Sequence, residues 1–526
     1  MNILVIRTHR FGDILQLTPM IGGLKRRYPG CRIHVLTDEA FTGLFVGNPD
    51  VDVLIAVPEI AWRLTLRNRP EQANRVHNEV SELAAALRAI GFDLVINRQY
   101  EWGGVLTSLV GGTRTVGGSW SQDKGFFFTD KSTAALYDVT RRNRRENRRN
   151  LADWACRIAG LPEGMPVEMF FPVTAMARWK ADRLLANLPP QDIVAVQLGA
   201  ARSFRQWEPE RFAEVIAGLV RDKGKTVLLI GSSDEWDLTQ NVFARLGQAG
   251  DKVRNLVGKT NIPALAGVLA RCEFLLTGDT GPMHLAAAVG TPTVSLFFGT
   301  AYPWETGPYG PGHIILFPDI PCAPCIDPAA CPHGHRCKRD LTPSLVLRAI
   351  EAREVYVSSG TFTWSADPAS AVTLLVTNRG RTAEQILQSP GRDGTCDALR
   401  SAQIGQRQRD TVSTNLAAEL FASADNIVRG FLSGSIDREF ARFPELLQDV
   451  VALIAATREV NETHLPDLTV LCREAALAQE RRDIVSLTDM VEHVIKPLIR
   501  WVNHGVATCA NRPDDPLISE RYYPDE

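Results

Sequence analysis

Residues 275–288 read Leu-Leu-Thr-Gly-Asp-Thr-Gly-Pro-Met-His-Leu-Ala-Ala-Ala, and this stretch decides the fold. The apolar run from Phe274 to Leu276 predicts a buried parallel strand, which Gly278 interrupts. An Ala-rich helix is predicted after Pro282, because proline suits the first position of a helix. The free backbone N–H groups at the helix start then face the space beyond the strand, together with the positive end of the helix dipole. This arrangement favours an anion, most simply a diphosphate.

The residues of this turn suit an anion site. Gly281 lets a ligand approach the backbone closely, and Thr280 offers a hydroxyl donor beside its own N–H. Asp279 and His284 supply polar groups next to the anion. The alternative is an ordinary turn between a strand and a helix, in which glycine and proline only mark the boundary. The rest of the chain has to decide between these two interpretations.

The composition is that of a globular protein with sizeable cores, because 45% of the residues are hydrophobic and 22% are charged. The length of 526 residues predicts about two to four domains. A net charge of −2 argues against a general nucleic-acid-binding protein. The sequence has no apolar stretch long enough to span a bilayer, and it starts without the features of a secretory signal. We therefore expect a cytoplasmic protein that binds no nucleic acid.

Strands and helices alternate in the first part of the chain. The run from Ile3 to Ile6 predicts a strand, and a loop with Gly12-Asp13 leads from it into a helix with apolar residues at helical spacing. Further strands are predicted at 33–36, 53–57 and 94–96, and an amphipathic helix over 80–90. Gly117-Gly118 predicts a turn that closes the region. This order is typical of a doubly wound domain with a parallel sheet.

A second alternation of the same kind follows Pro189-Pro190. It predicts strands at 194–198, 227–230 and 294–297, and helices from 209 and over 262–270. Two units of similar size predict an α/β protein with two Rossmann-like domains that face a cleft. Ligands bind such sheets at the carboxyl ends of the strands. The residues that fall at such ends are Gly12, Asp13, Gly199 to Arg205, Glu235 and Asp279 to Gly281.

Beyond residue 355 the sequence becomes mainly helical, apart from a strand predicted at 372–376. Apolar residues recur there at helical spacing, which indicates core more often than interface; examples are Leu416, Leu420, Ile427 and Phe431. We therefore expect a first Rossmann-like domain over 1–185, a second over 186–355, and a helical extension of unknown role over 356–526.

Residues 141–149 form the densest basic run, Arg-Arg-Asn-Arg-Arg-Glu-Asn-Arg-Arg. One interpretation is a solvated helix face. The other is a patch that binds an acidic acceptor, a phosphorylated glycolipid or an anionic membrane surface.

Four cysteines lie within sixteen residues: Cys322, Cys325, Cys331 and Cys337. Thiolates at this density suit a tetrahedral zinc site, although the spacing is not that of two Cys-x2-Cys knuckles. An iron–sulfur cluster fits less well, and a reducing cytoplasm disfavours disulfides. A structural zinc site, free thiols and redox chemistry stay open as interpretations.

Five motifs in order resemble one family, the lipopolysaccharide heptosyltransferase type of glycosyltransferase family 9, which has the GT-B architecture. The motifs are Ile6-Arg7-Thr8 with Phe11-Gly12-Asp13-Ile14 and Thr18-Pro19, Phe92-Asp93-Leu94-Val95-Ile96-Asn97, Gly199 with Arg205-Gln206-Trp207, Leu229-Ile230-Gly231 with Glu235, and Gly278 to His284. The resemblance covers about residues 1–350. The helical extension is not part of the common pattern.

The resemblance implies a nucleotide-diphosphate sugar donor bound mainly by the second domain, with an ADP-linked donor favoured. Arg205 stands where the family commonly has a lysine that pairs with the donor phosphates, and its fork suits bidentate contact with phosphate. Glu235 would accept hydrogen bonds from the donor ribose, or else cap the following helix. Asp279 would contact the donor sugar. The remaining residues implied at the donor site are Gly12, Ser203, Thr280, Gly281 and His284.

By the same analogy, Asp13 is the candidate general base. It would take the proton from an acceptor hydroxyl as that hydroxyl attacks the anomeric carbon, with inversion. The alternative for an Asp after Gly is an N-cap on the following helix. No cofactor or divalent metal is expected for catalysis if Arg205 and the backbone amides neutralise the leaving group.

The chain departs from the family at Ala200 and Ala201, where small hydroxyl residues are common, and Ser203 would have to substitute for them. Two alternatives therefore stay open. One is a GT-B nucleotide-sugar epimerase, which needs a further acid/base set. The other is a nucleotide-sugar-binding scaffold protein that lacks turnover and docks a partner through the helical extension.

The sequence thus favours a glycosyltransferase that moves a hexose or heptose to a lipopolysaccharide-type or other cell-envelope glycan acceptor. Heptose from ADP-heptose is one candidate donor sugar. The protein is expected in the cytoplasm, in peripheral contact with the inner face of the cytoplasmic membrane.

Overall fold

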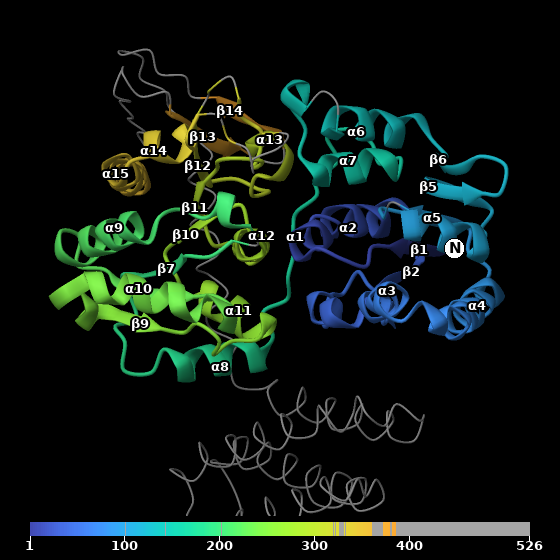
Figure 1. The fold of residues 1–526 in the computed structure, drawn as a ribbon, viewed down its shortest axis with the longest axis horizontal. Coiled ribbons are helices and arrows are strands. Elements are labelled where there is room, and N and C mark those ends of the chain that lie inside the picture. The colour runs from blue at the N-terminus through green and yellow to red at the C-terminus, as the bar shows by residue number, and fades with distance from the viewer. Residues whose placement is uncertain are drawn as a thin grey trace, which may run out of the picture. The chain divides into compact units, whose positions relative to one another are not determined.

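Two largely parallel α/β sheets make up the described part of the chain (Figure 1). The computed structural model describes residues 1–99, 101–141, 144–200, 202–318, 320, 322–325, 331, 333–359, 372–378 and 381–385. The chain divides into two units, Met1–Gln406 and Arg407–Glu526, and all described residues belong to the first. The apolar stripes predicted in the helical extension lie outside the described residues.

The first half is built on a sheet with the strand order β3-β2-β1-β4-β5-β6. All neighbouring strands pair in parallel except β5 and β6. The strand order reverses between β1 and β4. The elements are β1 (Asn2–Ile6), α1 (Phe11–Leu15), α2 (Thr18–Arg27), β2 (Arg32–Asp38), η1 (Glu39–Leu44), β3 (Val53–Val57), α3 (Glu59–Asn68), η2 (Pro70–Gln72), α4 (Ala73–Ile90), β4 (Leu94–Asn97), α5 (Glu101–Val110), β5 (Arg114–Ser121), β6 (Gly125–Phe128), α6 (Lys131–Arg141), η3 (Arg144–Glu146) and α7 (Leu151–Ile158).

In the second half, β9-β8-β7-β10-β11-β12 follow the strand order typical of a Rossmann fold, with the reversal between β7 and β10. The last two strands, β13 and β14, continue the sheet in antiparallel pairing. The elements are α8 (Ala175–Leu184), β7 (Ile193–Gln197), η4 (Ser203–Arg205), α9 (Pro209–Arg221), β8 (Thr226–Ile230), η5 (Ser233–Glu235), α10 (Trp236–Leu246), η6 (Gly247–Lys252), β9 (Val253–Asn255), α11 (Ile262–Leu269), β10 (Leu275–Gly278), α12 (Gly281–Ala288), β11 (Thr293–Leu296), α13 (Pro303–Thr306), β12 (Ile314–Pro318), α14 (Arg336–Asp340), α15 (Pro343–Ser359), β13 (Val372–Asn378) and β14 (Arg381–Gln385).

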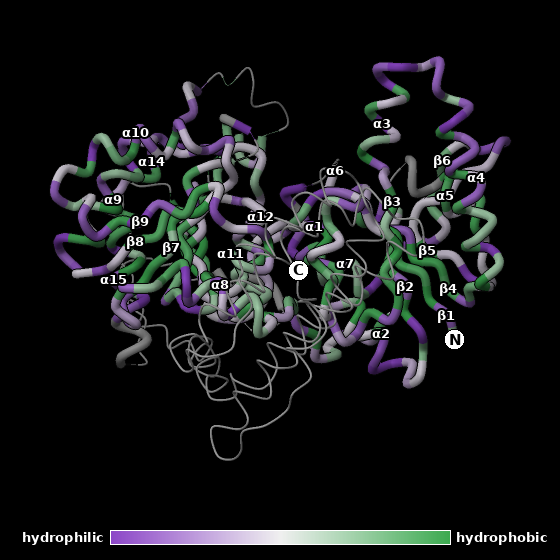
Figure 2. The backbone as a smooth tube through the Cα atoms, turned by 90° about the horizontal axis from the view of Figure 1, so that it is seen from below, coloured by the Kyte–Doolittle hydropathy of each residue, from purple (hydrophilic) through white to green (hydrophobic). Residues whose placement is uncertain are grey.

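Burial explains why short apolar runs form these strands. Every residue of β7, β8, β10 and β11 is buried, as expected for a parallel sheet with helices on both faces. Figure 2 shows β7 and β8 as hydrophobic segments. The predicted α/β class with two Rossmann-like sheets is confirmed. Among the described helices, none is long and apolar enough to cross a bilayer.

Two sequence predictions differ from the structure. The Gly117-Gly118 pair lies inside β5 and forms no turn there. Gly117 has a φ of +109°, and a Cβ on it would lie 2.0 Å from the carbonyl oxygen of Asn97, so glycine allows β5 to approach β4. In addition, the second sheet continues past residue 355 into β13 and β14. The other domain boundaries stay predictions.

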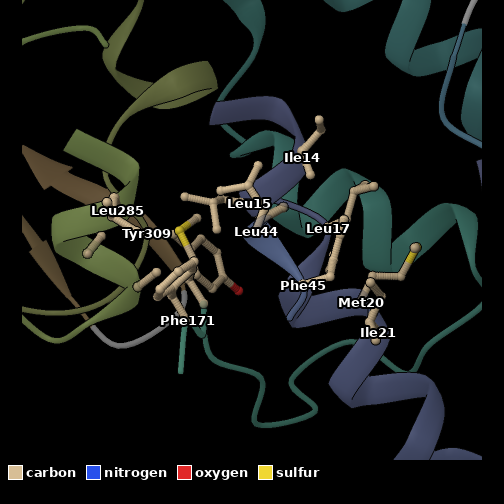
Figure 3. Packing of buried hydrophobic residues seen from close by; sticks show 14 of the residues in the cluster. Ile14, Leu15, Leu17, Met20, Ile21, Leu44, Phe45, Phe171, Leu285 and Tyr309 are labelled. Carbon is tan, nitrogen blue, oxygen red and sulfur yellow. The ribbon is translucent and has the colours of Figure 1, made fainter. Parts of the chain in front are cut away.

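One apolar cluster extends from the first half into the second (Figure 3). Leu15 and Leu44 come from the first half, and Leu285 and Tyr309 from the second. Phe171, between α7 and α8, belongs to the same cluster, and its N–H donates to the carbonyl oxygen of Ala288. This shared core brings α1 beside α12, which Figure 1 also shows.

Candidate active site

A cavity of about 1350 Å³ lies between the two halves. Its walls are formed by residues that follow β1 and β4 in the first half and β7, β8 and β10 in the second. Ligand sites of doubly wound sheets form where the strand order reverses, and both reversal points face this cavity. The predicted site residues that line it are Gly12, Asp13, Arg205, Glu235, Asp279, Thr280, Gly281 and His284. Ser203 begins η4, and its predicted phosphate contact stays a prediction.

Asp13 lies inside α1 and is held by arginine. The Arg7 guanidinium donates to Oδ2 of Asp13 and also to the backbone carbonyl of Arg98, which follows β4. The Asp13 side chain is 22% exposed, so its carboxylate reaches the cavity. The N-cap position of α1 belongs to Arg10, whose Nη1 lies 4.0 Å from Oδ2 of Asp13. The N-cap alternative therefore does not describe Asp13.

The wall of the cavity formed by the first half is strongly basic. Its arginines are Arg7, Arg10, Arg63, Arg98 and Arg144. Among the described lining residues of that half, Asp13 is the one carboxylate. Burial, followed by the charges of the neighbouring arginines, lowers the pKa of His9 to about 4. His9 is therefore neutral at pH 7, and the arginines dominate the charge that this wall presents to a ligand.

On the opposite wall, two predicted donor-site residues form one ion pair. Arg205 Nη1 lies 3.1 Å from Oδ2 of Asp279, and its Nε donates to the hydroxyl of Thr300 at 2.7 Å. The Asp279 side chain is 8% exposed. Burial raises the pKa of Asp279, and the Arg205 charge opposes that rise. Arg205 is thus a cation at the cavity wall, oriented by two side chains.

The turn at the start of α12 faces the same cavity. Thr280 is its N-cap and makes no side-chain cap hydrogen bond, and Thr280, Gly281 and Pro282 line the cavity. The Thr280 hydroxyl donates to Oε1 of Gln197 at 3.0 Å. The same hydroxyl also lies 3.0 Å from the hydroxyl oxygen of Thr277, so it already has two partners in this wall. What the turn offers an anion is its backbone N–H groups and the positive end of the helix.

Glu235 lies over the ends of β7 and β8. Its Oε2 accepts from the N–H of Gly199 at 3.0 Å, and burial raises the pKa of its carboxyl while that N–H opposes the rise. A Cβ on Gly199 or Gly231 would lie 2.3 or 2.5 Å from the Glu235 carboxyl group, so both glycines make room for it. Although Glu235 is at the N-cap position of α10, it makes no side-chain cap bond. Its carboxylate therefore faces the site instead of the helix.

Gln197, which sequence reasoning missed, connects the parts of this wall. Its Oε1 accepts from the hydroxyls of Thr277 and Thr280 at 2.9 and 3.0 Å. Its Nε2 donates to the carbonyl of Gly199 at 2.7 Å and lies 3.3 Å from both Glu235 oxygens. The available signal was a glutamine at the end of the otherwise apolar strand Ile-Val-Ala-Val-Gln.

His284 lies at the junction of the two halves. Its imidazole packs on Gly12, and its Nδ1 is buried without a hydrogen-bond partner among the described residues. Burial lowers the pKa of His284 to about 4, although the Asp13 charge opposes this shift. A neutral imidazole therefore stands close to both Asp13 and the start of α12.

Arginines of the basic run 141–149 make contacts with the second half. Arg144 pairs with Glu305 across the halves, with Nε 3.0 Å from Oε2. The Arg148 guanidinium donates to the hydroxyl of Tyr302 and lies 4.7 Å from the centre of the Trp304 ring. Sequence reasoning missed these partners. For Arg144 the interpretation as part of a solvated helix face is wrong, because it pairs with Glu305 of the second half, whereas Arg148 is exposed although it contacts Tyr302 and Trp304.

The zinc prediction for the cysteine cluster finds no support among the described residues. In the described ranges, which include all four cysteines, no group of three or more His, Cys, Asp or Glu residues could hold a metal ion. Cys337 is buried in the apolar core of the second half, and Cys331 Sγ accepts from the N–H of His335. Burial raises the pKa of the Cys325 and Cys337 thiols. All four cysteines are free thiols in this structure, and the charges of Cys337, Cys322 and Cys331 contribute to the raised pKa of Cys325.

Part of this sequence is similar to known glycosyltransferases. Residues 80–333 match the family model "Glycosyltransferase family 9 (heptosyltransferase)". Lipopolysaccharide heptosyltransferase 3 of Escherichia coli is 26% identical over 304 residues, which cover 56% of this chain and 84% of that protein. Lipopolysaccharide heptosyltransferase 1 of Pseudomonas aeruginosa is 28% identical over 348 residues, 62% of this chain and 86% of the relative.

A solved structure, that of the E. coli ADP-heptose lps heptosyltransferase II, has the same fold. It superimposes with a TM-score of 0.52 at 20% identity, covering 68% of this chain and all of that one. The paired sheets therefore have the GT-B fold. The sequence match makes residues 80–333, just under half of the chain, similar to glycosyltransferase family 9 and to the lipopolysaccharide heptosyltransferases.

Proposed function

We propose that this protein is an inverting glycosyltransferase that moves a sugar from a nucleoside-diphosphate donor to a lipopolysaccharide-type or other cell-envelope glycan acceptor. An ADP-linked donor is favoured, with heptose as the candidate sugar. One observation carries the proposal: a single cavity has Asp13 on one wall and Arg205, Asp279 and the start of α12 on the other. That arrangement supports Asp13 as a base opposite a site for a leaving diphosphate.

The second half would bind the donor. Arg205 and the N–H groups at Thr280 and Gly281 supply positive charge for the two phosphates. Asp279 would contact the sugar hydroxyls. The Glu235 carboxylate would accept hydrogen bonds from the ribose, because it lies at the end of β8 with its oxygens held by Gly199 and Ser232.

In the reaction, the acceptor hydroxyl attacks the anomeric carbon and Asp13 takes its proton. The bond between the anomeric carbon and the diphosphate oxygen breaks, and the diphosphate leaves with the electron pair. Arg205 and the start of α12 stabilise the charge that develops on it. These groups supply positive charge at the leaving group, so we propose that the transfer needs no divalent metal.

The acceptor would occupy the basic wall. Asp13 shares that wall with neutral His9 and with Arg7, Arg10, Arg63 and Arg98, which suits an acceptor that carries phosphate or carboxylate groups near the attacking hydroxyl. A phosphorylated or acidic cell-envelope glycolipid has this chemistry. The acceptor would thus be held by charge on the wall that presents the base.

Peripheral contact with the inner face of the cytoplasmic membrane would bring such a glycolipid to the cavity. The surface best placed for that contact in the described residues is α3. Its exposed Ile60 and Leu64 lie one helical turn apart, beside Arg67, and its Arg63 lines the cavity. Figure 2 shows α3 leading away from β3. Exposed apolar and basic side chains on one helix are what an anionic bilayer surface binds.

Calorimetry with ADP, UDP, GDP and their sugars tests the proposal on wild type and Arg205→Ala. Binding of one diphosphate that the variant loses would support the donor site and name the nucleotide. Binding of none would refute the donor site and favour the scaffold alternative. If Arg205→Ala bound as wild type does, the assignment of Arg205 would be wrong.

A further inference from the structure

Thr300, between β11 and α13, holds two arginines that come from different halves of the molecule. Its hydroxyl accepts from Arg205 Nε at 2.7 Å, and its carbonyl oxygen accepts from Arg144 Nη1 at 3.0 Å. Thr300 and both arginines line the cavity. One residue therefore connects the cation proposed for the donor phosphates with the basic run of the first half.

Arg144 directs its whole guanidinium to the second half. Nε and Nη2 lie 3.0 and 3.3 Å from the two oxygens of Glu305, a bidentate pair, and Nη1 takes the Thr300 carbonyl. The Glu305 side chain is 11% exposed. Burial raises the pKa of Glu305, and the charge of Arg144 opposes that rise. The Arg144–Glu305 pair, together with the hydrogen bond from Arg144 to the Thr300 carbonyl, therefore connects the two halves beside Thr300. We call this connection the strap.

Two of the three guanidinium nitrogens of Arg205 are hydrogen-bonded within the protein, and the third is left for a ligand. Its Nε is bonded to Thr300 and its Nη1 to Asp279, while Nη2 has no hydrogen-bond partner among the described residues. Two fixed nitrogens on a planar group determine where the third points. The position of the Thr300 hydroxyl therefore decides the direction of the nitrogen that remains for a phosphate oxygen.

We propose that Thr300 is a positioning residue for Arg205 and that the Arg144–Glu305 pair holds Thr300 in place, so that donor binding depends on a contact between the halves. This inference rests on the proposed function, because it takes Arg205 as the phosphate-binding cation. It also explains how arginine replaces the lysine common in the family. A lysine has no Nε–H to donate to Thr300, so the strap is matched to arginine.

The test is the affinity for ADP, or for whichever diphosphate the nucleotide panel identifies, in Thr300→Val and Thr300→Ser. Valine has nearly the shape of threonine but no hydroxyl, and we expect it to weaken binding about five- to tenfold, the effect of one lost hydrogen bond to a charged group. Serine keeps the hydroxyl and should restore affinity to within about twofold of wild type. Equal affinity of Thr300→Val and wild type would overturn the inference.

A double-mutant cycle separates positioning from a general structural role. If Thr300 acts through Arg205, then Thr300→Val should cost no further affinity in an Arg205→Ala background. A second loss of the same size would overturn the inference, even if both variants fold. Thermal unfolding of each variant checks that the folded state is retained.

The strap is tested by Glu305→Gln, with Arg149→Ala as the matched control. Arg149 belongs to the same basic run but pairs with Glu163 of the first half, and it does not line the cavity. We expect Glu305→Gln to weaken ADP binding about threefold or more, and Arg149→Ala to leave it unchanged. Equal effects of the two variants would reject the strap. Failure of wild type to bind any diphosphate would instead refute the proposed function itself.

Discussion

The imidazole of His284 packs directly on the backbone of Gly12, so that a Cβ on Gly12 would lie 2.4 Å from Cδ2 of His284. The neighbouring contact is reciprocal, because a Cβ on Gly281 would lie 2.6 Å from Cδ1 of Phe11. Each helix start thus carries a glycine where the other helix start presents a ring. Two glycines let α1 and α12 touch, and this contact brings Asp13 close to the turn that would hold the diphosphate.

Gly12→Ala should therefore separate the base from the donor site. A new methyl group at 2.4 Å from a buried ring forces one helix to shift. We expect sugar transfer to fall at least tenfold, since displacement of reacting groups by about 1 Å is costly. The matched control is Gly43→Ala, because a Cβ on Gly43 meets no atom within 4 Å. Equal transfer rates in the two variants would contradict this account of the contact.

Asp13→Asn should separate binding from catalysis. The amide keeps the shape of the side chain but cannot accept the acceptor's proton. We expect transfer to fall by about 10²–10⁴-fold, while the affinity for the donor diphosphate changes by less than about threefold, because the proposed phosphate contacts lie on the other wall. Steady-state kinetics and calorimetry on the same preparation measure both. Turnover near the wild-type level would exclude Asp13 as the base.

The sequence predicted the sheets well because parallel strands buried on both faces appear as continuous apolar runs. It also placed most donor-site candidates at strand ends, which the reversal points of the two sheets bring to one cavity. It failed where glycine serves a close approach instead of a turn, as at Gly117. A glycine in a turn and a glycine at a close approach look alike in the sequence. Only the position of the neighbouring strand distinguishes them.

Contacts between distant segments could not be predicted from local pattern. Arg144 and Glu305 are 161 positions apart, and nothing near either residue signals the other. A run of arginines has the composition of a solvated face whether or not acidic and aromatic partners cover it. Gln197 and Thr300 carry no motif, so their roles depend on the assembled cavity.

His284 should make stability depend on pH between about 4 and 6.5. Its pKa in the folded protein, about 4, lies below the value of 6.5 expected when unfolded, so the unfolded chain binds more protons in this window. Its contribution to stability is present above pH 6.5 and is lost as the pH falls toward 4. His284→Gln should lower the slope of unfolding free energy against pH by up to about 1.4 kcal/mol per pH unit there. Urea titrations between pH 4.5 and 7.5 measure that slope, and an unchanged slope would contradict the buried, neutral state of His284.

Glu59 should make the stability of the protein fall as the pH rises, which is opposite to the effect of His284. The residue is fully buried at the start of α3, and its nearest cation is Arg63, with Nη1 3.6 Å from Oε1. Burial raises the pKa of Glu59, so its contribution to stability is present below the unfolded value of about 4.5 and is lost as the pH rises through the folded value. Glu59→Gln should therefore stabilise the protein at pH 8, by on the order of 1 kcal/mol. Glu82→Gln, at an exposed position of α4, is the control. A destabilised Glu59→Gln at pH 8 would show that the ionised carboxylate is stabilised in the folded state.

Membrane association through α3 is tested by sedimentation with vesicles that contain anionic lipid. Wild type should bind at low salt and be released at high salt, because charge on the vesicle surface is screened within about 10 Å at 0.1 M salt. Leu64→Ser removes an exposed apolar side chain and Arg67→Glu reverses a charge, and together they should weaken binding at least about fivefold. Trp236→Ser is the matched control, since Trp236 is an exposed apolar residue of the second half, 46% exposed against 52% for Leu64. If the control lost as much binding as the α3 variant, contact would not be specific to α3. If wild type did not bind at low salt, the proposed peripheral contact would be wrong, and the acceptor would have to reach the basic wall without help from the membrane surface.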